Sequence, residues 1–203
     1  MAKKLNKTRI RDTAALVGSC FIAILFSKQI FDHTEIGAHE SMEFFGYFLV
    51  AAGAIGRIYS TAFLGGFKNG KIIDYGPFSV CRNPLYLFSF VGVCGIAIMS
   101  ANLFAIIVLP IGFLAIYIPL IKREEEYLKS SFGQPYINYM KKTPRLFPNF
   151  KLYHAPKEVT MTPKTLLNAV KDSVMWFLAF PILELIEWLQ DAGYLKPIFY
   201  LNF

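Results

Sequence analysis

Hydrophobic residues in this chain come in long uninterrupted blocks rather than in short periodic stripes. The longest block, residues 83–121, contains no charged side chain. A helix rises about 1.5 Å per residue and a hydrocarbon layer is about 30 Å thick, so this block is roughly long enough to cross a membrane twice. The Ser-Ala-Asn tripeptide at 100–102 is a favourable turn in its middle. The pattern therefore predicts a helical hairpin over residues 85–99 and 103–121.

Two further blocks predict membrane spans, and a third has mixed character. Residues 13–31 are apolar apart from a lysine and a glutamine near the end, and residues 44–67 are apolar apart from Arg57. Residues 173–189 are apolar but contain two glutamates, so they span, re-enter or lie at the interface; a membrane-embedded helix is the favoured interpretation. The expected fold is an all-α, polytopic integral membrane protein with about four to five transmembrane helices.

Composition and charge agree with a membrane protein. Hydrophobic residues make up 55% of the 203 and charged residues 17%, against about 25% charged in soluble domains. Basic residues precede the first block, are absent from the acidic loop after it, return at Lys68, Lys71 and Arg82, and are frequent in 122–171. This alternation follows the positive-inside rule and favours a membrane over nucleic acid as the partner of a chain with a net charge of +7.

The same alternation predicts which segments are cytoplasmic. They are the N-terminus, the loop before residue 83 and the segment after residue 121. The membrane would be the inner membrane of a bacterium or the endoplasmic reticulum of a eukaryote.

The three cysteines and three histidines show no metal-binding or disulfide spacing. Two of the cysteines fall in predicted spans, where Cys behaves as a small apolar residue. His33 and His39 fall in the acidic loop, on the far side from the cytoplasmic segments. We therefore predict neither a bound metal nor a disulfide.

Two polar clusters flank the hairpin and are expected to meet on one side of the membrane. Asn83 and Pro84 precede it as a favourable helix cap and first helical residue. Residues 124–126, three glutamates, follow it as a solvated helix face or as partners of Arg82. Each cluster also has a binding interpretation. The helix N-terminus at Asn83, next to Arg82, could hold a carboxylate or phosphate group of a ligand. The glutamates could bind the amine and the ribose hydroxyls of a cofactor.

As an ordered set the motifs cover residues 46–148. They are Gly76-Pro77-Phe78, Arg82-Asn83-Pro84-Leu85-Tyr86, Glu124-Glu125-x-x-Leu128, Phe132-Gly133, Tyr136, Tyr139 and Pro144-Arg145. This pattern resembles that of the isoprenylcysteine carboxyl methyltransferase family and, more distantly, that of the phospholipid N-methyltransferases. The chain departs from the family at two positions, where Asn83 replaces a histidine and Phe78 replaces a tyrosine.

The resemblance implies a membrane enzyme that binds S-adenosylmethionine in a pocket at the cytosolic face. The residues implied to contact or shape the cofactor site are Gly76, Arg82, Asn83, Pro84, Tyr86, Glu124, Glu125 and Tyr136. Arg145 and Tyr136 belong to the implied lid. The corresponding regions are a membrane body (1–121), a cytosolic cofactor-pocket and lid region (122–150) and a C-terminal extension (151–203) with an embedded or interfacial helix.

Candidate catalytic residues are Arg57, Arg145 and Tyr86. Because a charge inside a span is costly, Arg57 either snorkels, pairs with Glu184 or Glu187, or holds an anionic lipid head in a cavity. Arg145 would play a similar part from the lid side.

Methyl transfer from a sulfonium requires alignment of nucleophile, methyl group and sulfur, and no metal. The acceptor is a lipid or lipid-linked group: a prenylcysteine carboxylate, a lipid phosphate or a phospholipid amine. Asn83 cannot titrate near neutral pH, which favours an anionic acceptor that needs no base. The alternatives are a membrane reductase that uses a nicotinamide cofactor, since sterol reductases share a similar helical layout, and a non-catalytic membrane scaffold.

Overall fold

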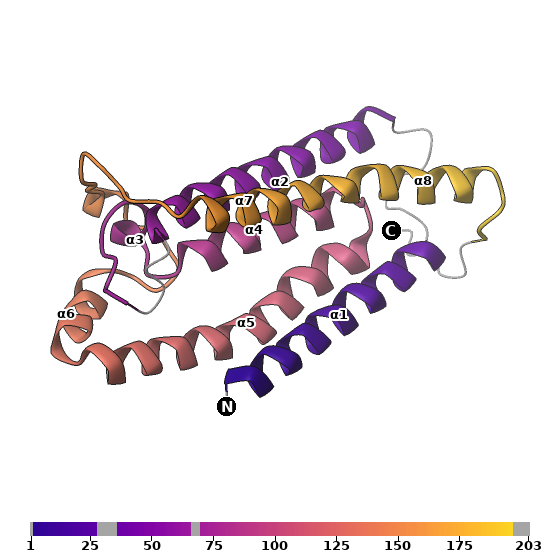
Figure 1. Cartoon of the computed structure of the whole chain (residues 1–203). Coiled ribbons are helices and arrows are strands. Elements are labelled where there is room, and N and C mark those ends of the chain that lie inside the picture. Colours follow the sequence, from indigo (N-terminus) through magenta and orange to yellow (C-terminus); the bar gives the residue numbers. More distant parts are fainter. Residues whose placement is uncertain (1, 28–35, 66–69, 197–203) are drawn as a thin grey trace. The chain divides into compact units, whose positions relative to one another are not determined.

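The computed structural model describes residues 2–27, 36–65 and 70–196, and in those residues the chain is helical without a strand. The α-helices are α1 (Ala2–Phe26), α2 (Ile36–Leu64), α3 (Pro77–Val80), α4 (Pro84–Met99), α5 (Leu103–Phe132), α6 (Gln134–Lys142), α7 (Pro163–Val174) and α8 (Ala179–Asp191) (Figure 1). The all-α expectation is confirmed for this part of the chain. His33 and Lys68, which entered the charge and ligand arguments, lie outside the described residues.

The predicted hairpin is confirmed almost to the residue. Helix α4 ends at Met99, α5 begins at Leu103, and a turn joins them. Helix α5 continues past residue 121 to Phe132, so it carries the three glutamates as a direct extension. Pro110 and Pro119 lie inside α5 without ending it, as proline does in many membrane helices.

In the residues that the structure describes, two helices are long and apolar enough to cross a membrane, Gly37–Leu64 and Leu103–Phe132. Helix α4 has 16 residues, fewer than the about 20 that a span requires. Only 28% and 22% of the two apolar windows is buried, whereas the core helix of a soluble protein is mostly buried. Large apolar side chains such as Phe44, Ile55 and Ile111 are exposed, as expected beside lipid. A total of four to five spans remains a prediction.

The apolar segment 173–189 is not one helix, contrary to the favoured interpretation. Helix α7 ends at Val174, a single 3-10 turn covers Met175–Leu178, and α8 starts at Ala179. Pro181 is the third residue of α8, in the first turn, where its missing N–H leaves no helical bond unmade. The same proline in the middle of a helix would remove a backbone hydrogen bond, which explains why the helix restarts here.

The chain forms two compact units from non-contiguous segments. Unit 1 comprises residues 1–51, 90–116 and 177–203, and unit 2 comprises residues 52–89 and 117–176. Helices α2, α4 and α5 each contribute one part to each unit. The three regions expected from the sequence were a membrane body (1–121), a cofactor-pocket and lid region (122–150) and a C-terminal extension (151–203). This division stays a prediction.

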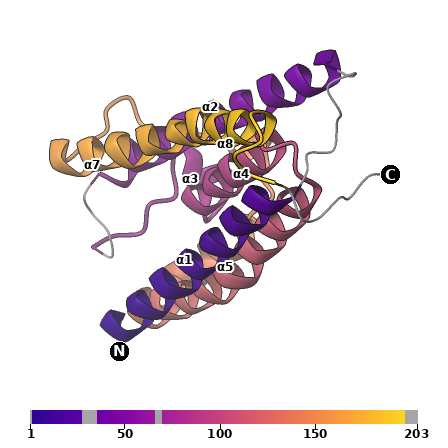
Figure 2. The same ribbon diagram turned by 90° about the vertical axis from the view of Figure 1, so that its right-hand side faces the viewer.

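Helix α1 lies beside the first part of α5 in unit 1 (Figure 2). The unit packs through small side chains and close backbone approach. Its buried core joins α1, α4 and α5 through Cys20, Ala97, Ala105 and Leu109. A Cβ atom on Gly46 would lie 2.7 Å from the carbonyl oxygen of Gly95, so α2 and α4 approach backbone to backbone. Gln190 of α8 donates to the carbonyl oxygens of Ile24 and Leu25, both at 3.1 Å, and thereby satisfies unpaired acceptors at the end of α1.

Unit 2 ties the segment after α6 to the segment before α4. Backbone hydrogen bonds run from Arg82 N–H to Pro144 C=O (2.8 Å), from Asn149 N–H to Val80 C=O (2.9 Å) and from Gly76 N–H to His154 C=O (2.7 Å). Figure 1 shows α3 and α6 near each other at the end of α5. The two motif-bearing stretches are therefore held together by the main chain as well as by side chains.

Gly76 and Gly133 offer a matched pair of substitutions that tests this packing. Both adopt φ of +61°, which an L-residue tolerates poorly. A Cβ atom on Gly76 would lie 2.2 Å from the ring of Phe63, whereas one on Gly133 meets nothing within 4 Å. Both alanine variants carry backbone strain of about 1–3 kcal/mol, and only Gly76→Ala adds a clash.

We therefore expect Gly76→Ala to lower the Tm clearly more than Gly133→Ala. Thermal unfolding in detergent micelles measures both shifts. Equal shifts would show that Phe63 does not pack against Gly76.

Candidate active site

The carboxylate of Glu125 is the centre of a cluster that joins three motifs in unit 2. Glu125 is only 3% exposed. Its Oε1 accepts hydrogen bonds from Arg82 Nε and Asn83 Nδ2, both at 3.0 Å. Its Oε2 accepts from Arg145 Nε at 2.9 Å and lies 2.8 Å from Arg145 Nη2. Arg82, Asn83, Glu125 and Arg145 are named the Glu125 cluster below.

Arg82 extends this cluster to the end of α6. Its side chain is 8% exposed, and its Nη1 donates to the carbonyl oxygens of Met140 (2.6 Å) and Thr143 (3.1 Å). These bonds satisfy acceptors that the end of a helix leaves unpaired. The structure thus supports the pairing interpretation of Arg82: the anion that it holds is Glu125.

Asn83 has the predicted place before α4 but another role for its side chain. Helix α4 begins at Pro84, as expected. The Asn83 amide donates to Glu125 and, at 3.2 Å, to the carbonyl oxygen of Arg145. An amide group carries two N–H donors whatever the pH, whereas a neutral imidazole carries one. Asparagine is therefore well suited to this double donation at the position where the family has histidine.

Tyr86 and Glu124 form a second pair on the neighbouring face of α5. The Tyr86 hydroxyl donates to Glu124 Oε2 at 3.0 Å, and its ring lies 5.7 Å from that of Tyr117. The two adjacent glutamates therefore have different partners, because consecutive helical residues point about 100° apart.

Among the described residues, no carboxylate is in hydrogen-bond contact with Arg57 in unit 2, although Asp172 lies within electrostatic reach of it. Its Nη1 donates to Ser89 Oγ, and its guanidinium lies 5.1 Å from the ring centroid of Trp176. Its Nε is buried and has no hydrogen-bond partner among the described residues. Glu187, one of the partners considered from sequence, instead lies near His39, with its Oε1 3.8 Å from His39 Nε2. An unsatisfied buried donor is costly, which makes Arg57 a candidate for binding an anionic ligand.

Three further ionisable groups of this region, Tyr136, Tyr139 and Cys81, stay protonated at neutral pH. Burial, with a further contribution from the Glu125 charge, raises the pKa of Tyr136 to about 12. Burial also raises the pKa of Tyr139, whose hydroxyl donates to the Phe78 carbonyl oxygen at 2.7 Å. Burial raises the pKa of the Cys81 thiol to about 11. None of the three is a base or an anionic nucleophile near pH 7.

Tyr136 is expected to make stability depend on pH in the alkaline range. Its pKa is about 12 in the folded chain and about 10 in an unfolded one. The folded state therefore holds this proton more tightly, so the stabilisation is fully present below about pH 10 and is lost as the pH rises towards 12. Tyr136→Phe removes the ionisable group and should lose less stability than the wild type over this range.

Thermal unfolding at about pH 8 to 11 measures this difference. Tyr127→Phe is the matched control, because Tyr127 is exposed on α5, and it should keep the wild-type pH dependence. Identical pH dependence in wild type and Tyr136→Phe would contradict the assignment.

Two cavities lie beside α6 in unit 2. One of about 240 Å³ borders the Glu125 cluster and is lined by Lys122, Glu125, Glu126, Lys129, Met140 and Arg145. Another, of about 400 Å³, includes Asp74, Asn138, Tyr139 and His154 in its lining. Of the residues expected at the cofactor site, Glu125 and Arg145 line the smaller cavity, while Arg82 and Asn83 support Glu125 from behind.

Three lining residues of the smaller cavity did not emerge from the motifs: Lys122, Lys129 and Met140. A signal for two of them is present in the sequence. Positions 122, 125, 126 and 129 follow the i, i+3, i+4, i+7 spacing of one helical face. Met140 comes from α6, and only the tertiary structure brings it to the cavity.

The expected resemblance was tested by comparison with known families. Residues 41–135 match the phospholipid methyltransferase family. This match confirms the resemblance to this group of methyltransferases. The motifs had indicated the phospholipid methyltransferases as the more distant of the two similar families. The matched segment contains Gly76 to Tyr86 and both Glu124 and Glu125. It ends before Tyr136 and Arg145, so the match does not cover these two residues.

Two curated proteins are similar to the chain over nearly its whole length. The cobalt-zinc-cadmium resistance protein CzcN of Cupriavidus metallidurans is 28% identical over 96% of this chain and 88% of its own length. The nickel-cobalt-cadmium resistance protein NccN of Alcaligenes xylosoxydans xylosoxydans is 28% identical over 97% of this chain and 91% of its own length.

Proposed function

We propose that this chain is a membrane methyltransferase that uses S-adenosylmethionine and methylates an anionic lipid or lipid-linked acceptor at the cytoplasmic face. The observation that carries the proposal is the Glu125 cluster, in which the separate motifs of the family pattern meet through hydrogen bonds. The matched family and the two apolar helices support the reaction class and the membrane setting.

The smaller cavity has the charges that the amino-acid end of the cofactor requires. Lys122, Lys129 and Arg145 would face a carboxylate, and Glu126 would face an ammonium group. Ligand pockets usually measure about 300–1,000 Å³, so a cavity of about 240 Å³ suits one end of the cofactor rather than the whole. The Arg145 side chain is 40% exposed and keeps N–H groups open to a ligand.

The cofactor supplies an electrophilic methyl group on a sulfonium, and the protein supplies position and charge. The Glu125 cluster fixes the cavity wall, because Glu125 is bonded on both oxygens. Tyr86 lies within electrostatic reach of Arg57 and bonds Glu124, next to Glu125. We assign to Arg57 the binding of the acceptor's anionic group, since its Nε is buried and lacks a partner among the described residues.

An acceptor that is already an anion fits this site best. A carboxylate or phosphate needs no proton removed before it attacks the methyl group. Cys81 and Tyr136 are protonated near neutral pH, and Asn83 does not titrate. A prenylcysteine-type carboxylate and a lipid phosphate are therefore favoured over a phospholipid amine.

Calorimetry separates this function from the nicotinamide-dependent alternative. Purified protein in micelles is titrated with S-adenosylhomocysteine and, separately, with a reduced nicotinamide cofactor. We expect saturable heat with the first and none with the second; the reverse result would overturn the proposal. Incubation with methyl-labelled S-adenosylmethionine and a total lipid extract then identifies the acceptor class from the labelled product.

The names of the two relatives support a physiological role. Both name resistance to cobalt and cadmium. We extend the proposal accordingly: methylation by this chain raises cellular tolerance of these two ions. Growth of a sensitive host at graded cobalt or cadmium concentrations tests the role. The wild-type chain should raise the inhibitory concentration and Arg57→Ala should not; equal protection by both would disconnect tolerance from methyl transfer.

A further inference from the structure

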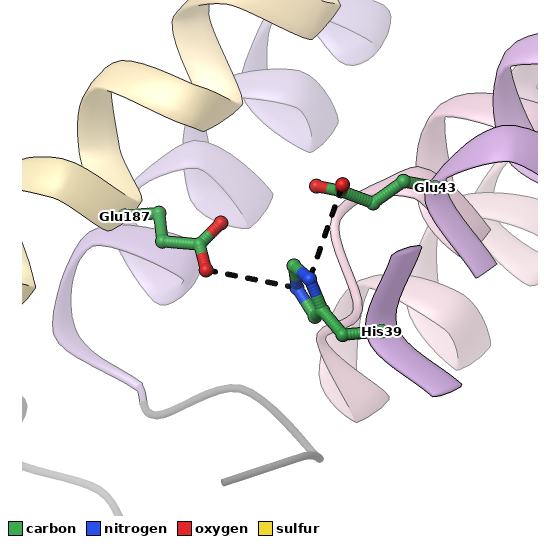
Figure 3. A group of neighbouring side chains, drawn as sticks. All are labelled: His39, Glu43 and Glu187. Atoms are coloured by element: carbon green, nitrogen blue, oxygen red, sulfur yellow. Dashed lines mark ion pairs between the residues drawn. The ribbon is translucent and has the colours of Figure 1, made fainter. Parts of the chain in front are cut away.

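A histidine and two glutamates from distant parts of the sequence meet in unit 1. His39 and Glu43 lie one turn apart on α2, and Glu187 comes from α8 (Figure 3). One ligand atom from each residue can be chosen so that all three lie within 4.8 Å of one another. These three residues are named the His39 cluster. The expectation of no metal rested on the spacing of histidines and cysteines along the chain, which does not show such a grouping.

The imidazole of His39 lies between the two carboxylates without bonding either of them directly. Its Nδ1 is 3.9 Å from Glu43 Oε2 and its Nε2 is 3.8 Å from Glu187 Oε1. Both distances exceed the about 2.7–3.2 Å of a hydrogen bond. The Nε2 atom is buried and has no hydrogen-bond partner among the described residues. Because this buried nitrogen makes no hydrogen bond, it is available to coordinate a metal ion.

Several acidic side chains gather around this group. The carboxylate of Glu43 also faces those of Glu40 and Glu184. In the part of the chain that the structure describes, no lysine or arginine forms an ion pair with any of these glutamates. Repulsion among several carboxylates is relieved when a divalent cation binds between them.

The spacing fits such a cation after small side-chain rotations. The centre of a triangle with sides of about 3.5–3.8 Å lies about 2.0–2.2 Å from each corner, which matches zinc bonds to histidine nitrogen and carboxylate oxygen. In the His39 cluster one ligand atom from each residue lies within 4.8 Å of the others, so side-chain rotations that shorten the longest of these distances bring the three atoms to that size. Imidazole together with carboxylates suits zinc, cobalt and nickel ions better than magnesium or calcium.

We propose that His39, Glu43 and Glu187 bind one divalent transition-metal ion. Three protein ligands leave at least one coordination position open, as in exchangeable or catalytic sites rather than closed structural ones. The site uses residues of unit 1 only, so it stands independently of the methyltransferase function proposed for unit 2.

The whole protein in detergent micelles, stripped with a chelator, tests the proposal by titration with Co²⁺ and with Zn²⁺. We expect one Co²⁺ per chain, with visible absorption bands of a low-coordinate site, and competition by Zn²⁺. His39→Gln and Glu187→Gln should each weaken Co²⁺ binding at least about tenfold. His154→Gln and Glu158→Gln are matched controls from the exposed loop after α6, and both should bind as the wild type does.

Zinc should also raise the Tm of the wild type and not that of Glu187→Gln, because a ligand that binds only the folded state stabilises it. This measurement and a helical circular dichroism spectrum distinguish a lost site from a misfolded variant. Absence of stoichiometric binding in the wild type would overturn the proposal. Unchanged Co²⁺ binding in folded His39→Gln and Glu187→Gln would overturn it as well. The three residues would then be a structural contact between a histidine and two glutamates.

Discussion

Replacing Glu125 with glutamine is expected to destabilise the protein by about 3–5 kcal/mol and to abolish cofactor binding. The change leaves Arg82, which is 8% exposed, without its counter-ion in a buried site, and breaking one side of a buried ion pair has a cost of this size. Arg145 adds little to the stability term because its side chain is 40% exposed. Denaturant unfolding in micelles and calorimetry with S-adenosylhomocysteine measure the two effects.

Two further variants make this result interpretable. Glu158→Gln removes the same charge from an exposed loop position and should leave both measurements unchanged. Arg145→Ala should change stability by less than about 1 kcal/mol while weakening S-adenosylhomocysteine binding at least about tenfold, since Arg145 lines the cavity. Cofactor binding that survives in both Glu125→Gln and Arg145→Ala would place the cofactor elsewhere, and the larger cavity beside Tyr139 would then be the next site to probe.

Replacing Arg57 with alanine is expected to lower kcat/KM for the acceptor by about 100-fold and to leave cofactor affinity within about twofold. One or two charge-assisted hydrogen bonds of about 1.5–3 kcal/mol each account for a loss of that size. Arg57→Lys should give an intermediate value, because lysine keeps the charge but not the planar fork. Initial rates at varied acceptor concentration, beside calorimetry with S-adenosylhomocysteine, separate the two effects.

Arg123→Ala is the matched control for Arg57. Arg123 is exposed on α5 and has no place in the proposed site, so its removal should change neither measurement. A parallel loss of cofactor affinity and rate in Arg57→Ala would show that Arg57 supports the structure of unit 2 through Ser89 and Trp176 rather than binding the acceptor.

The correspondence between expectation and structure differs from one part of the chain to another. The hairpin was predicted almost to the residue, because residues 83–121 form an uncharged block with a polar turn signal in its middle, at 100–102. For the segment 173–189 a membrane-embedded helix was the favoured interpretation, because the segment is apolar apart from two glutamates. The break at Met175–Leu178 follows from the place of Pro181 in the new first turn, and apolar composition alone does not show it.

For the candidate site, the motifs identified which residues matter but not what each one contacts. Arg82, Asn83 and Glu125 were expected near one another, and the structure brings them together. In the structure Glu125 lines the smaller cavity and accepts hydrogen bonds from Arg82 and Asn83, whereas the motif pattern allowed either contact with the cofactor or a shaping role for all three. Lys122 and Lys129 share a helical face with Glu125, a periodic signal that the motif pattern does not contain.

The sequence by itself determined that the chain is helical, that long apolar segments alternate with polar ones, and that the methyltransferase motifs flank one hairpin. These are local properties, since segment length, hydropathy and turn residues act over a few neighbouring positions. Only the tertiary structure decided that Glu125 pairs with Arg82 and Arg145 while Glu124 takes Tyr86, and that Glu187 joins His39. Such pairings depend on the rotation and packing of whole helices, which bring together residues far apart in the chain.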